Sequence, residues 1–393
     1  MVIFYLCVVI TLLIVVIHLA LLVGVLANRV RDVLFRRFVR KVREEKLREV
    51  LVDGKRVVDK LKVSVIIAAR DEEANLPKLI DSLKDQTDKD FEIVFVNDRS
   101  TDRTGEILKR FADEMPERVK VVNNTREPVN CNPKQFALDL GIEVATGDIF
   151  LFSDADCEFP ETWVEYYRYY FMEESVKLVF GQVMVRNDGS FLQRYQAFDQ
   201  MLIHQYNSGS AGLGIPTGCF GNNLAVRREV MESIGGFKAL GYTLTEDAAL
   251  LERVGRERKW KIRVSTMKET IVKPAPQRDW KSFLNQHVRW NRGGFYSTDL
   301  MSGISYGFIV LYLVLSVLVV PAGFFWGFLL MLPATSFIFP GLLAFVAGLM
   351  YERDRKSFLL WFLPDMLTFM LFYSVATVLA LFKISVKWKG SKL

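Results

Sequence analysis

The N-terminal run of residues 2–27 contains no formally charged side chain, apart from a proton that His18 can carry. This run is longer than the roughly 20 apolar residues that span the hydrocarbon core of a bilayer as a helix. Basic residues follow the run instead of preceding it, which argues against a cleaved signal peptide. The sequence therefore predicts an uncleaved transmembrane anchor over residues 1–28. A cationic amphipathic helix lying on anionic lipid is the alternative, and the two are compatible.

The rest of the chain divides into a mixed middle and a second apolar region. Hydrophobic residues make up 51% of the chain and charged residues 24%, and the apolar excess recurs at residues 304–350 and 358–382. This predicts a charged connector over residues 29–60, a cytoplasmic globular domain over 61–300 and a membrane region over 301–393. The positive-inside rule places the N-terminus outside and the globular domain in the cytoplasm of an integral membrane protein. Much of the net charge of +6 lies beside the membrane, so we expect no nucleic-acid partner.

The number of C-terminal spans stays open in the sequence. Residues 304–350 suffice for two spans broken near Pro333, and residues 358–382 for a third or for a re-entrant hairpin bent near Pro364. A third span would export the lysines that follow residue 382, against the positive-inside preference, whereas a re-entrant or interfacial segment would not. Asp365 is either a functional residue facing protein or water, or a residue at the membrane interface.

The middle of the chain alternates short β-branched runs with helical patterns. We expect strands at 63–69, 91–96, 119–122 and 149–152, with helices near 76–83, 103–112 and 134–144 between them. Strands and helices that take turns predict an α/β fold with a mostly parallel sheet whose faces are covered.

Acidic residues follow three of these strands. Ligands of such sheets bind beyond the carboxyl ends of the strands, where Asp71, Asp98 and Asp154 occur. A single carboxylate of this kind is more often a helix cap or a turn residue, but three at one edge indicate a site. Asp154 and Asp156 stand two residues apart, so both carboxylates face one side, and their hard oxygens suit Mg²⁺ or Mn²⁺. The chain has no Walker A loop, so a carboxylate-bound metal is the expected way to neutralise a diphosphate.

Taken together, these motifs resemble those of the membrane-embedded family 2 glycosyltransferases with the GT-A fold, such as ceramide glucosyltransferase and poly-N-acetylglucosamine, hyaluronan and cellulose synthases. The match runs from about residue 63 to 292, with a proline at position 133 where the family has glycine. The matching segments are Ala69-Arg70-Asp71-Glu72-Glu73, Asn97-Asp98-Arg99-Ser100, Pro133-Lys134-Gln135, Asp154-Ala155-Asp156, Gly221-Asn222-Asn223, Gly235-Gly236-Phe237, Thr245-Glu246-Asp247 and Gln286-His287-Val288-Arg289-Trp290.

The resemblance implies a role for each part of the site. The metal would be bound by Asp156 with Asp154, and Asp247 would be the general base of a single displacement with inversion. Taken alone, Thr245-Glu246-Asp247 would be a helix N-cap with an acidic first turn. The nucleotide sugar, a UDP-sugar by resemblance, would be held by Ala69, Arg70, Glu72, Asp98, Lys134 and Asp154.

The last motif would serve the acceptor or the diphosphate. Gln286, Arg289 and Trp290 fall on one helical face, although an interfacial tryptophan beside a snorkelling arginine is the alternative. The membrane region is smaller than that of cellulose synthase, which weighs against secretion of a long polymer. We therefore expect an inverting hexosyl- or N-acetylhexosaminyltransferase acting on a membrane lipid, with a processive polysaccharide synthase as the alternative.

Overall fold

The computed structural model describes residues 1–45, 50–52, 55–57, 61–187, 189–257, 259–295, 300–351, 355–382, 387–388 and 391–392. These residues form two compact units. The sheet unit consists of Leu26–Arg186 and Gly214–Ala275, and the helical unit of Met1–Val25, Asn187–Leu213 and Pro276–Leu393. The sequence places segments 187–213 and 276–300 with the globular domain, whereas in the structure they belong to the helical unit. The domain boundaries expected from the sequence remain predictions.

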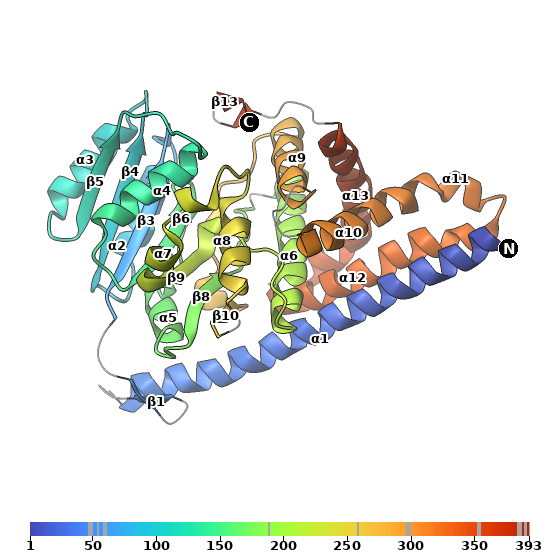
Figure 1. Ribbon diagram of the computed structural model, residues 1–393, viewed down its shortest axis with the longest axis horizontal. Helices are drawn as coiled ribbons and strands as arrows, with labels where there is room; N and C mark the ends of the chain where they lie inside the picture. Colours follow the sequence, from blue (N-terminus) through green and yellow to red (C-terminus); the bar gives the residue numbers. More distant parts are fainter. Residues whose placement is uncertain are drawn as a thin grey trace. The chain divides into compact units, whose positions relative to one another are not determined.

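The sheet unit is built on a mixed, mostly parallel sheet of seven strands in the described residues (Figure 1). Strands β3, β4, β5 and β6 run parallel to one another, whereas β9 is antiparallel to both of its neighbours. The expected α/β alternation is confirmed. In spatial order the strands are β10 (Lys261–Ser265), β8 (Val176–Gly181), β9 (Leu224–Arg227), β6 (Ile149–Asp154), β3 (Val63–Ala69), β4 (Phe91–Asp98) and β5 (Val119–Asn124).

Helices cover both faces of this sheet because successive strand residues point to opposite sides. Phe95 packs edge-to-face on Phe111 of one helix, whereas the next residue, Val96, packs in a cluster with Ala137 and Leu140 of another. The helices of the unit are α2 (Leu76–Lys84), α3 (Thr104–Glu114), α4 (Pro133–Val144), α5 (Trp163–Tyr170), α7 (Arg228–Ile234) and α8 (Glu246–Gly255). Short pairs β1–β2 (Val50–Val52, Lys55–Val57) and β7–β11 (Cys157–Glu158, Lys273–Pro274) lie outside the main sheet.

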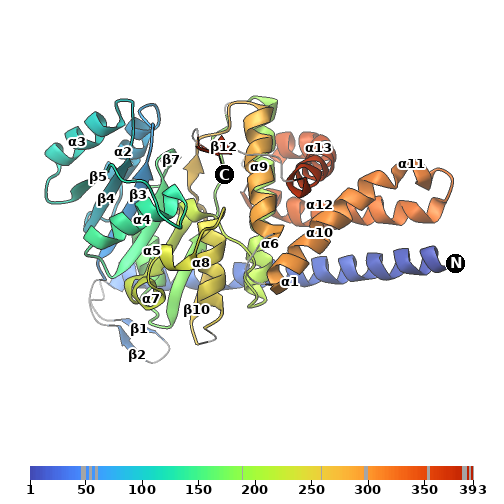
Figure 2. The same cartoon turned by 45° about the horizontal axis from the view of Figure 1, so that its top comes forward.

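The helical unit contains the apolar helices of the chain (Figure 2). In the described residues, three stretches are long and apolar enough to cross a membrane, at Val2–Arg43, Gly327–Met350 and Lys356–Leu381, and Tyr306–Leu318 forms a shorter apolar helix. The unit comprises the start of α1 (Val2–Glu45), then α6 (Phe191–Gly212), α9 (Trp280–Phe295), α10 (Leu300–Leu318), α11 (Val320–Gly323), α12 (Met331–Tyr351) and α13 (Arg355–Leu381).

The structure places both prolines of this region within helices. The break that we expected near Pro333 lies upstream, between Leu318 and Met331, because Pro333 sits in the first turn of α12, where its missing N–H has no helical partner anyway. The re-entrant hairpin near Pro364, one of the two alternatives that the sequence left open, is not formed, because α13 continues through this proline as one helix. Residues 352–354 and 383–386, on which the topology argument partly depends, lie outside the described residues.

Asp365 in α13 faces protein, which agrees with the first of its two interpretations and not with a residue at the membrane interface. Its side chain is buried and forms an ion pair with Arg194 of α6. The Arg194 guanidinium also lies 4.4 Å from the centre of the Trp361 ring, one turn before Asp365. A carboxylate on an apolar helix is therefore neutralised inside the helical unit.

Helix α1 extends beyond the expected anchor, and its second half belongs to the sheet unit. Asp32 accepts hydrogen bonds from the backbone N–H of Thr266 (3.0 Å) and from the hydroxyl of Tyr170 (3.1 Å). One turn further along α1, Phe35 stacks on the Tyr170 ring at 3.9 Å. The basic residues after the apolar run thus lie on a helix that is packed against the sheet unit on one side.

The first half of α1 packs closely on α6 in the helical unit. Gly24 faces Gly209 and Gly212, and a Cβ atom on Gly24 would overlap the carbonyl oxygen of Gly209. Nearby, the imidazole of His18 hydrogen-bonds the hydroxyl of Tyr206 at 2.9 Å. Small residues at such a crossing allow two helix backbones to approach each other, as is common in membranes.

We expect Gly24→Ala to destabilise the helical unit by about 1–3 kcal/mol, because the added methyl group overlaps backbone atoms that cannot rotate away. The measurement is the thermal unfolding midpoint of the purified protein in detergent. Gly307→Ala is the matched control, since its Cβ would lie 3.5 Å from the nearest side-chain atom and alanine favours a helix. Equal midpoints for the two variants would contradict the close crossing.

Candidate active site

Three neighbouring parallel strands bring the expected nucleotide-binding residues to one edge of the sheet. Ala69 ends β3 and pairs in register with Asn97, which precedes Asp98 at the end of β4. Asp154 ends β6 and pairs in register with Ala68. The carboxyl ends of β3, β4 and β6 therefore form the edge at which parallel sheets bind ligands.

A single lysine joins three of the sequence motifs at this edge. Lys134, in the first turn of α4, places its ammonium 2.6 Å from Asp154 and 3.0 Å from Glu246, the first residue of α8. Burial of Lys134 disfavours its charged form, but the carboxylates of Asp154, Glu246 and Asp247 outweigh this and raise the pKa of Lys134 above its ordinary value. The ammonium therefore stays charged among the acidic residues of the site.

Glu246 is a site residue that the sequence did not reveal. Its side chain is buried, with Lys134 as a charged partner, whereas the neighbouring Asp247 is half-buried. The available clue was its place beside Asp247 in the Thr245-Glu246-Asp247 motif. This clue was not decisive, because an acidic residue is also favourable in the first turn of a helix.

Asp247 is held by two backbone amides. The N–H of Gly221 donates a hydrogen bond of 2.8 Å to one carboxylate oxygen, and the N–H of Ala248 donates one of 2.8 Å to the other. Burial, followed by the negative charge of Glu246, raises the pKa of Asp247 to about 6, although Lys134 and the two amides act in the opposite direction. A carboxylate with a pKa near neutrality is a better proton acceptor than an ordinary aspartate.

The segment around Gly221 explains why Asp247 is fixed in place. A Cβ atom on Gly221 would lie 3.0 Å from the Asp247 side chain, which is tighter than most contacts of this kind, so glycine favours the close approach. Two residues later, the buried Asn223 accepts hydrogen bonds from Trp163 (2.9 Å) and Tyr167 (2.6 Å). Asn223 also donates to the carbonyl oxygens of residues 182 and 270. This fully bonded side chain anchors the Gly221-Asn222-Asn223 segment.

The start of α4 is connected to the loop that precedes α8. Asn132 and Gln135 form a reciprocal capping box, and Pro133 occupies the first helical turn, where a proline is tolerated. The Gln135 amide also donates to the carbonyl oxygens of Phe237 (3.0 Å) and Gly241 (2.8 Å). The proline in place of the family's glycine is thus compatible with the position of Lys134.

Part of the acidic cluster after β3 is structural. The Asp71 carboxylate accepts a 2.7 Å hydrogen bond from the backbone N–H of Thr101, and Glu73 accepts one of 3.1 Å from Arg103. Glu72 accepts a hydrogen bond of 2.7 Å from Asn75. The bonds of Asp71 and Glu73 tie the loop after β3 to the loop after β4, whereas the bond of Glu72 lies within the first of these loops.

The side chain of Asp98 is almost fully buried and is held by Arg99 and Asn124. Its carboxylate receives two hydrogen bonds from Arg99, at 2.9 and 3.0 Å, and one of 2.7 Å from Asn124. Only 5% of its side chain is exposed, against 15% for Arg99. Arg99 adopts a left-handed backbone conformation (φ 58°), which is strained for this residue type and turns its side chain back onto Asp98.

The residues proposed to bind metal provide two carboxylates. Asp154 and Asp156 are both half-buried and flank the turn after β6. In the described residues, no group of three or more His, Cys, Asp or Glu side chains could hold a metal ion. Two carboxylates nevertheless fit Mg²⁺ or Mn²⁺, which commonly take one or two protein ligands and complete their shell with water and substrate phosphates.

The three expected acceptor-side residues lie elsewhere, on α9 of the helical unit. Gln286, Arg289 and Trp290 are half-buried, and the Trp290 ring lies 4.9 Å from the ring of His287. They share one helical face as the sequence predicts, since α9 is continuous from Trp280 to Phe295.

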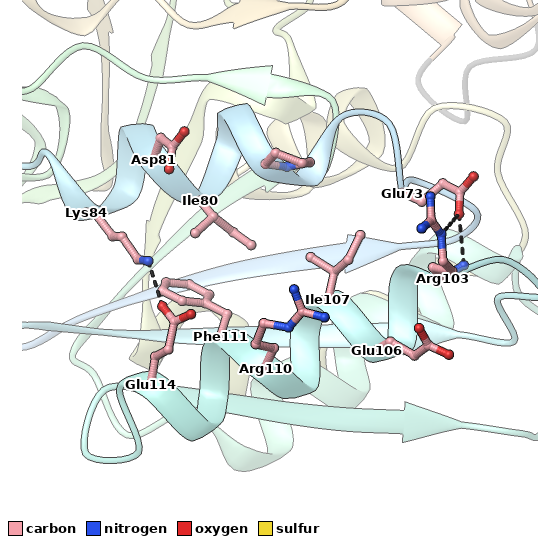
Figure 3. A pocket seen from close by; sticks show the side chains of 11 residues that line it. Glu73, Ile80, Asp81, Lys84, Arg103, Glu106, Ile107, Arg110, Phe111 and Glu114 are labelled. Atoms are coloured by element: carbon pink, nitrogen blue, oxygen red, sulfur yellow. Dashed lines mark hydrogen bonds and ion pairs between the residues drawn. The ribbon is translucent and has the colours of Figure 1, made fainter.

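A surface groove between α2 and α3 is lined by Glu73 but not by Lys134, Asp154 or Asp247 (Figure 3). Its floor is formed by apolar side chains such as Ile80 and Phe111, and ion pairs such as Lys84–Glu114 (2.7 Å) line its sides. Charges that neutralise one another across a groove leave little to recognise a charged ligand, so we assign it no role.

Comparison with known proteins agrees with this geometry. The model of the family described as Glycosyl transferase family 2 matches residues 64–235. The probable glycosyltransferase YdaM of Bacillus subtilis (strain 168) is 29% identical over 245 residues, which cover 60% of this chain and 56% of that protein. The beta-monoglucosyldiacylglycerol synthase of Nostoc sp. is 27% identical over 240 residues, covering 59% of this chain and 49% of that protein. The match thus extends over about half the length of these relatives.

A solved structure supports the fold. The mannosyltransferase PcManGT from Pyrobaculum calidifontis, in complex with GDP-Man and Mn²⁺, aligns with a TM-score of 0.54 and 17% identity over 94% of this chain and 99% of its own. At this identity the similarity concerns the fold alone. Residues 64–235 are therefore similar to Glycosyl transferase family 2, and the fold of the chain is GT-A-like.

Proposed function

We propose that this protein is an inverting glycosyltransferase that moves a hexose or N-acetylhexosamine from a nucleotide sugar to a membrane lipid. The observation that carries the proposal is the meeting of Lys134, Asp154 and Glu246 beside Asp247. Three motifs that are far apart in the sequence thus supply a half-buried cation, a metal-type carboxylate and a candidate base at one sheet edge.

The donor end of the site is proposed to bind a nucleoside diphosphate. Ala69, Arg70 and Glu72 after β3 would contact the nucleotide, together with the Asp98–Arg99 pair after β4. Asp154 and Asp156 would hold Mg²⁺ or Mn²⁺, which neutralises the charge that develops on a departing diphosphate. The charged Lys134 would contribute positive charge beside the same group. UDP is the first candidate for the nucleotide, and GDP is the second, because the PcManGT structure contains GDP-Man together with Mn²⁺.

Asp247 is proposed to take the proton of the acceptor hydroxyl as the new glycosidic bond forms. An alcohol is a weak nucleophile, and removal of its proton as it attacks makes one displacement with inversion sufficient. The two backbone amides fix the direction in which the carboxylate faces. Gln286, Arg289 and Trp290 are proposed to contact the acceptor or the diphosphate.

The acceptor is proposed to be a lipid in a membrane that α1, α12 and α13 enter. The three apolar stretches are long enough to cross a bilayer, and one relative is named as a glucosyldiacylglycerol synthase. The proposed topology keeps the N-terminus outside and the sheet unit in the cytoplasm, beside the basic residues of α1.

The pH dependence of turnover should reveal the state of Asp247. A protonated carboxyl group cannot accept the acceptor's proton, and the pKa of Asp247 is raised to about 6. We therefore expect kcat/KM to fall about tenfold per pH unit as the pH drops below 6, and to reach a plateau above it. Nucleotide affinity measured over the same range is the control. A profile that stays flat down to about pH 4.5 would contradict the assignment.

The proposed reaction is tested on the purified protein in lipid with radiolabelled UDP- and GDP-sugars and 1,2-dioleoylglycerol. A lipid acceptor gives a product that extracts into organic solvent and carries one added sugar by mass. A ladder of growing chains that does not extract would favour the processive polysaccharide synthase. No incorporation from any donor would overturn the proposal.

A further inference from the structure

A buried contact between a carboxyl group and an imidazole joins α6 and α9 in the helical unit. Asp199 of α6 and His287 of α9 have no exposed side-chain surface, and Asp199 Oδ2 lies 2.9 Å from His287 Nε2. The imidazole is enclosed by aromatic rings, with centroids at 4.3 Å for Phe283 and 5.0 Å for Phe372. A polar contact in such surroundings is expensive to break, because water cannot replace the lost partner.

The hydrogen bonds of His287 fix how many protons the pair holds. Its Nδ1 lies 3.1 Å from the carbonyl oxygen of Phe283, which can only accept, so Nδ1 carries a hydrogen atom. The contact between Nε2 and the Asp199 carboxylate then needs one further proton, on either side. The pair is therefore neutral as a whole, and it acts as a hydrogen bond and not as a source of net charge.

The pair lies beside the proposed acceptor-side residues on α9. One α-helical residue turns the chain by about 100°, so the buried residues of α9 form one face and the three motif residues an adjacent face. The buried face is fixed by His287 and also by Asn291, which donates to Thr377 of α13 at 3.2 Å. Rotation of α9 about its axis would break these contacts and turn the motif face with them.

We infer that the Asp199–His287 pair is a positioning element that fixes the rotation of α9, and so the orientation of the three acceptor-side residues. The inference rests on the proposed function, and of the two partners proposed there it takes the acceptor as the one that these residues contact. The pair is expected to affect use of the acceptor and not binding of the donor, whose residues lie in the sheet unit.

Three variants separate positioning from other roles. Asp199→Ala and His287→Phe both remove the hydrogen bond, and the phenylalanine keeps the ring packing. Asp199→Asn keeps the hydrogen bond, because its amide can donate to the unprotonated Nε2 while Nδ1 still donates to Phe283. The matched control is Tyr206→Phe, which removes a 2.9 Å hydrogen bond of the same helix α6, but one made to His18 of α1.

The first readout is sugar transfer to 1,2-dioleoylglycerol beside donor affinity. We expect Asp199→Ala and His287→Phe to lower kcat/KM for the lipid by on the order of 10- to 100-fold with unchanged nucleotide-sugar affinity, as misplacement of binding groups does. Asp199→Asn and Tyr206→Phe should stay within about threefold of the parent protein. Loss in Asp199→Asn equal to that in Asp199→Ala would overturn the inference and favour a role for the charge itself.

The second readout does not depend on activity. Gln286→Cys is introduced into each background, and maleimide labelling is followed by mass spectrometry on the peptide that contains residue 286. Labelling should change severalfold with Asp199→Ala and His287→Phe and stay unchanged with Asp199→Asn and Tyr206→Phe. If the parent protein transfers sugar to no lipid, the proposed function fails while this readout still decides on positioning. Unchanged labelling in folded variants, or loss of folding in both, would leave the pair a stability element only and overturn the inference.

Discussion

Asp247→Asn is expected to lower turnover by on the order of 10²–10⁴, because an amide cannot accept the proton of the acceptor hydroxyl. Affinity for the nucleotide sugar should stay nearly unchanged, since Asp247 lies on α8 and not on the strand ends proposed to hold the nucleotide. Turnover is measured beside calorimetric donor affinity, with and without Mn²⁺. Added Mn²⁺ should not restore the lost activity.

The fold of this variant needs its own check. The two oxygens of Asp247 each accept a backbone N–H, and an asparagine oxygen can serve one of the two. The thermal unfolding midpoint therefore accompanies the kinetic measurement. Turnover at the normal rate, or a loss of donor affinity as large as the loss of turnover, would make the acidic first turn of α8 the better explanation of this motif.

Asp156→Asn is expected to fail for a different reason, by weakening metal capture. A neutral amide is a poorer ligand for a hard dication than a carboxylate. Mutation of residues that only support metal ligands already weakens metal binding by ~10–100-fold, so the Mn²⁺ concentration needed for half-maximal activity should rise by at least this factor. Saturating Mn²⁺ should restore part of the turnover, in contrast to Asp247→Asn.

Asp156 is a better choice for this test than Asp154. Removal of the Asp154 carboxylate would also release Lys134 from an ion pair of 2.6 Å, and would change two properties at once. Titration of donor binding with Mn²⁺ by calorimetry measures the effect directly. A donor affinity that depends on Mn²⁺ equally in Asp156→Asn and in the parent protein would remove Asp156 from the metal site.

The sheet and its ligand-binding edge could be predicted because their signals are local. Strands such as 63–69 combine β-branched residues with full burial, and the carboxyl end of each parallel strand must lie at the same edge. The motif residues Asp98, Asp154 and Lys134 are therefore placed by topology alone. The side-chain partners of these residues could not be predicted, because Lys134 is 112 positions from Glu246 and no periodicity links the two.

The helical unit shows the same limit more strongly. The apolar pattern predicts that α12 and α13 exist, but not that Pro364 is accommodated within one continuous helix. Nor does it show that His287 is bonded to Asp199 of another helix. Contacts between segments distant in the sequence depend on packing, which composition and period do not encode.

The Arg194–Asp365 pair has a consequence for the biogenesis of the protein. Asp365 leaves the ribosome 171 positions after Arg194, as part of the last apolar helix. Until the two meet, an unpaired aspartate at the centre of such a helix opposes insertion by about 2.5–3.5 kcal/mol. We therefore expect α13 to insert stably only after α6 has folded, so that completion of the membrane region depends on a segment synthesised much earlier. On the proposed topology, a chain whose α6 fails to fold would keep α13 loosely held and open to degradation, so the ion pair would couple membrane insertion to correct assembly.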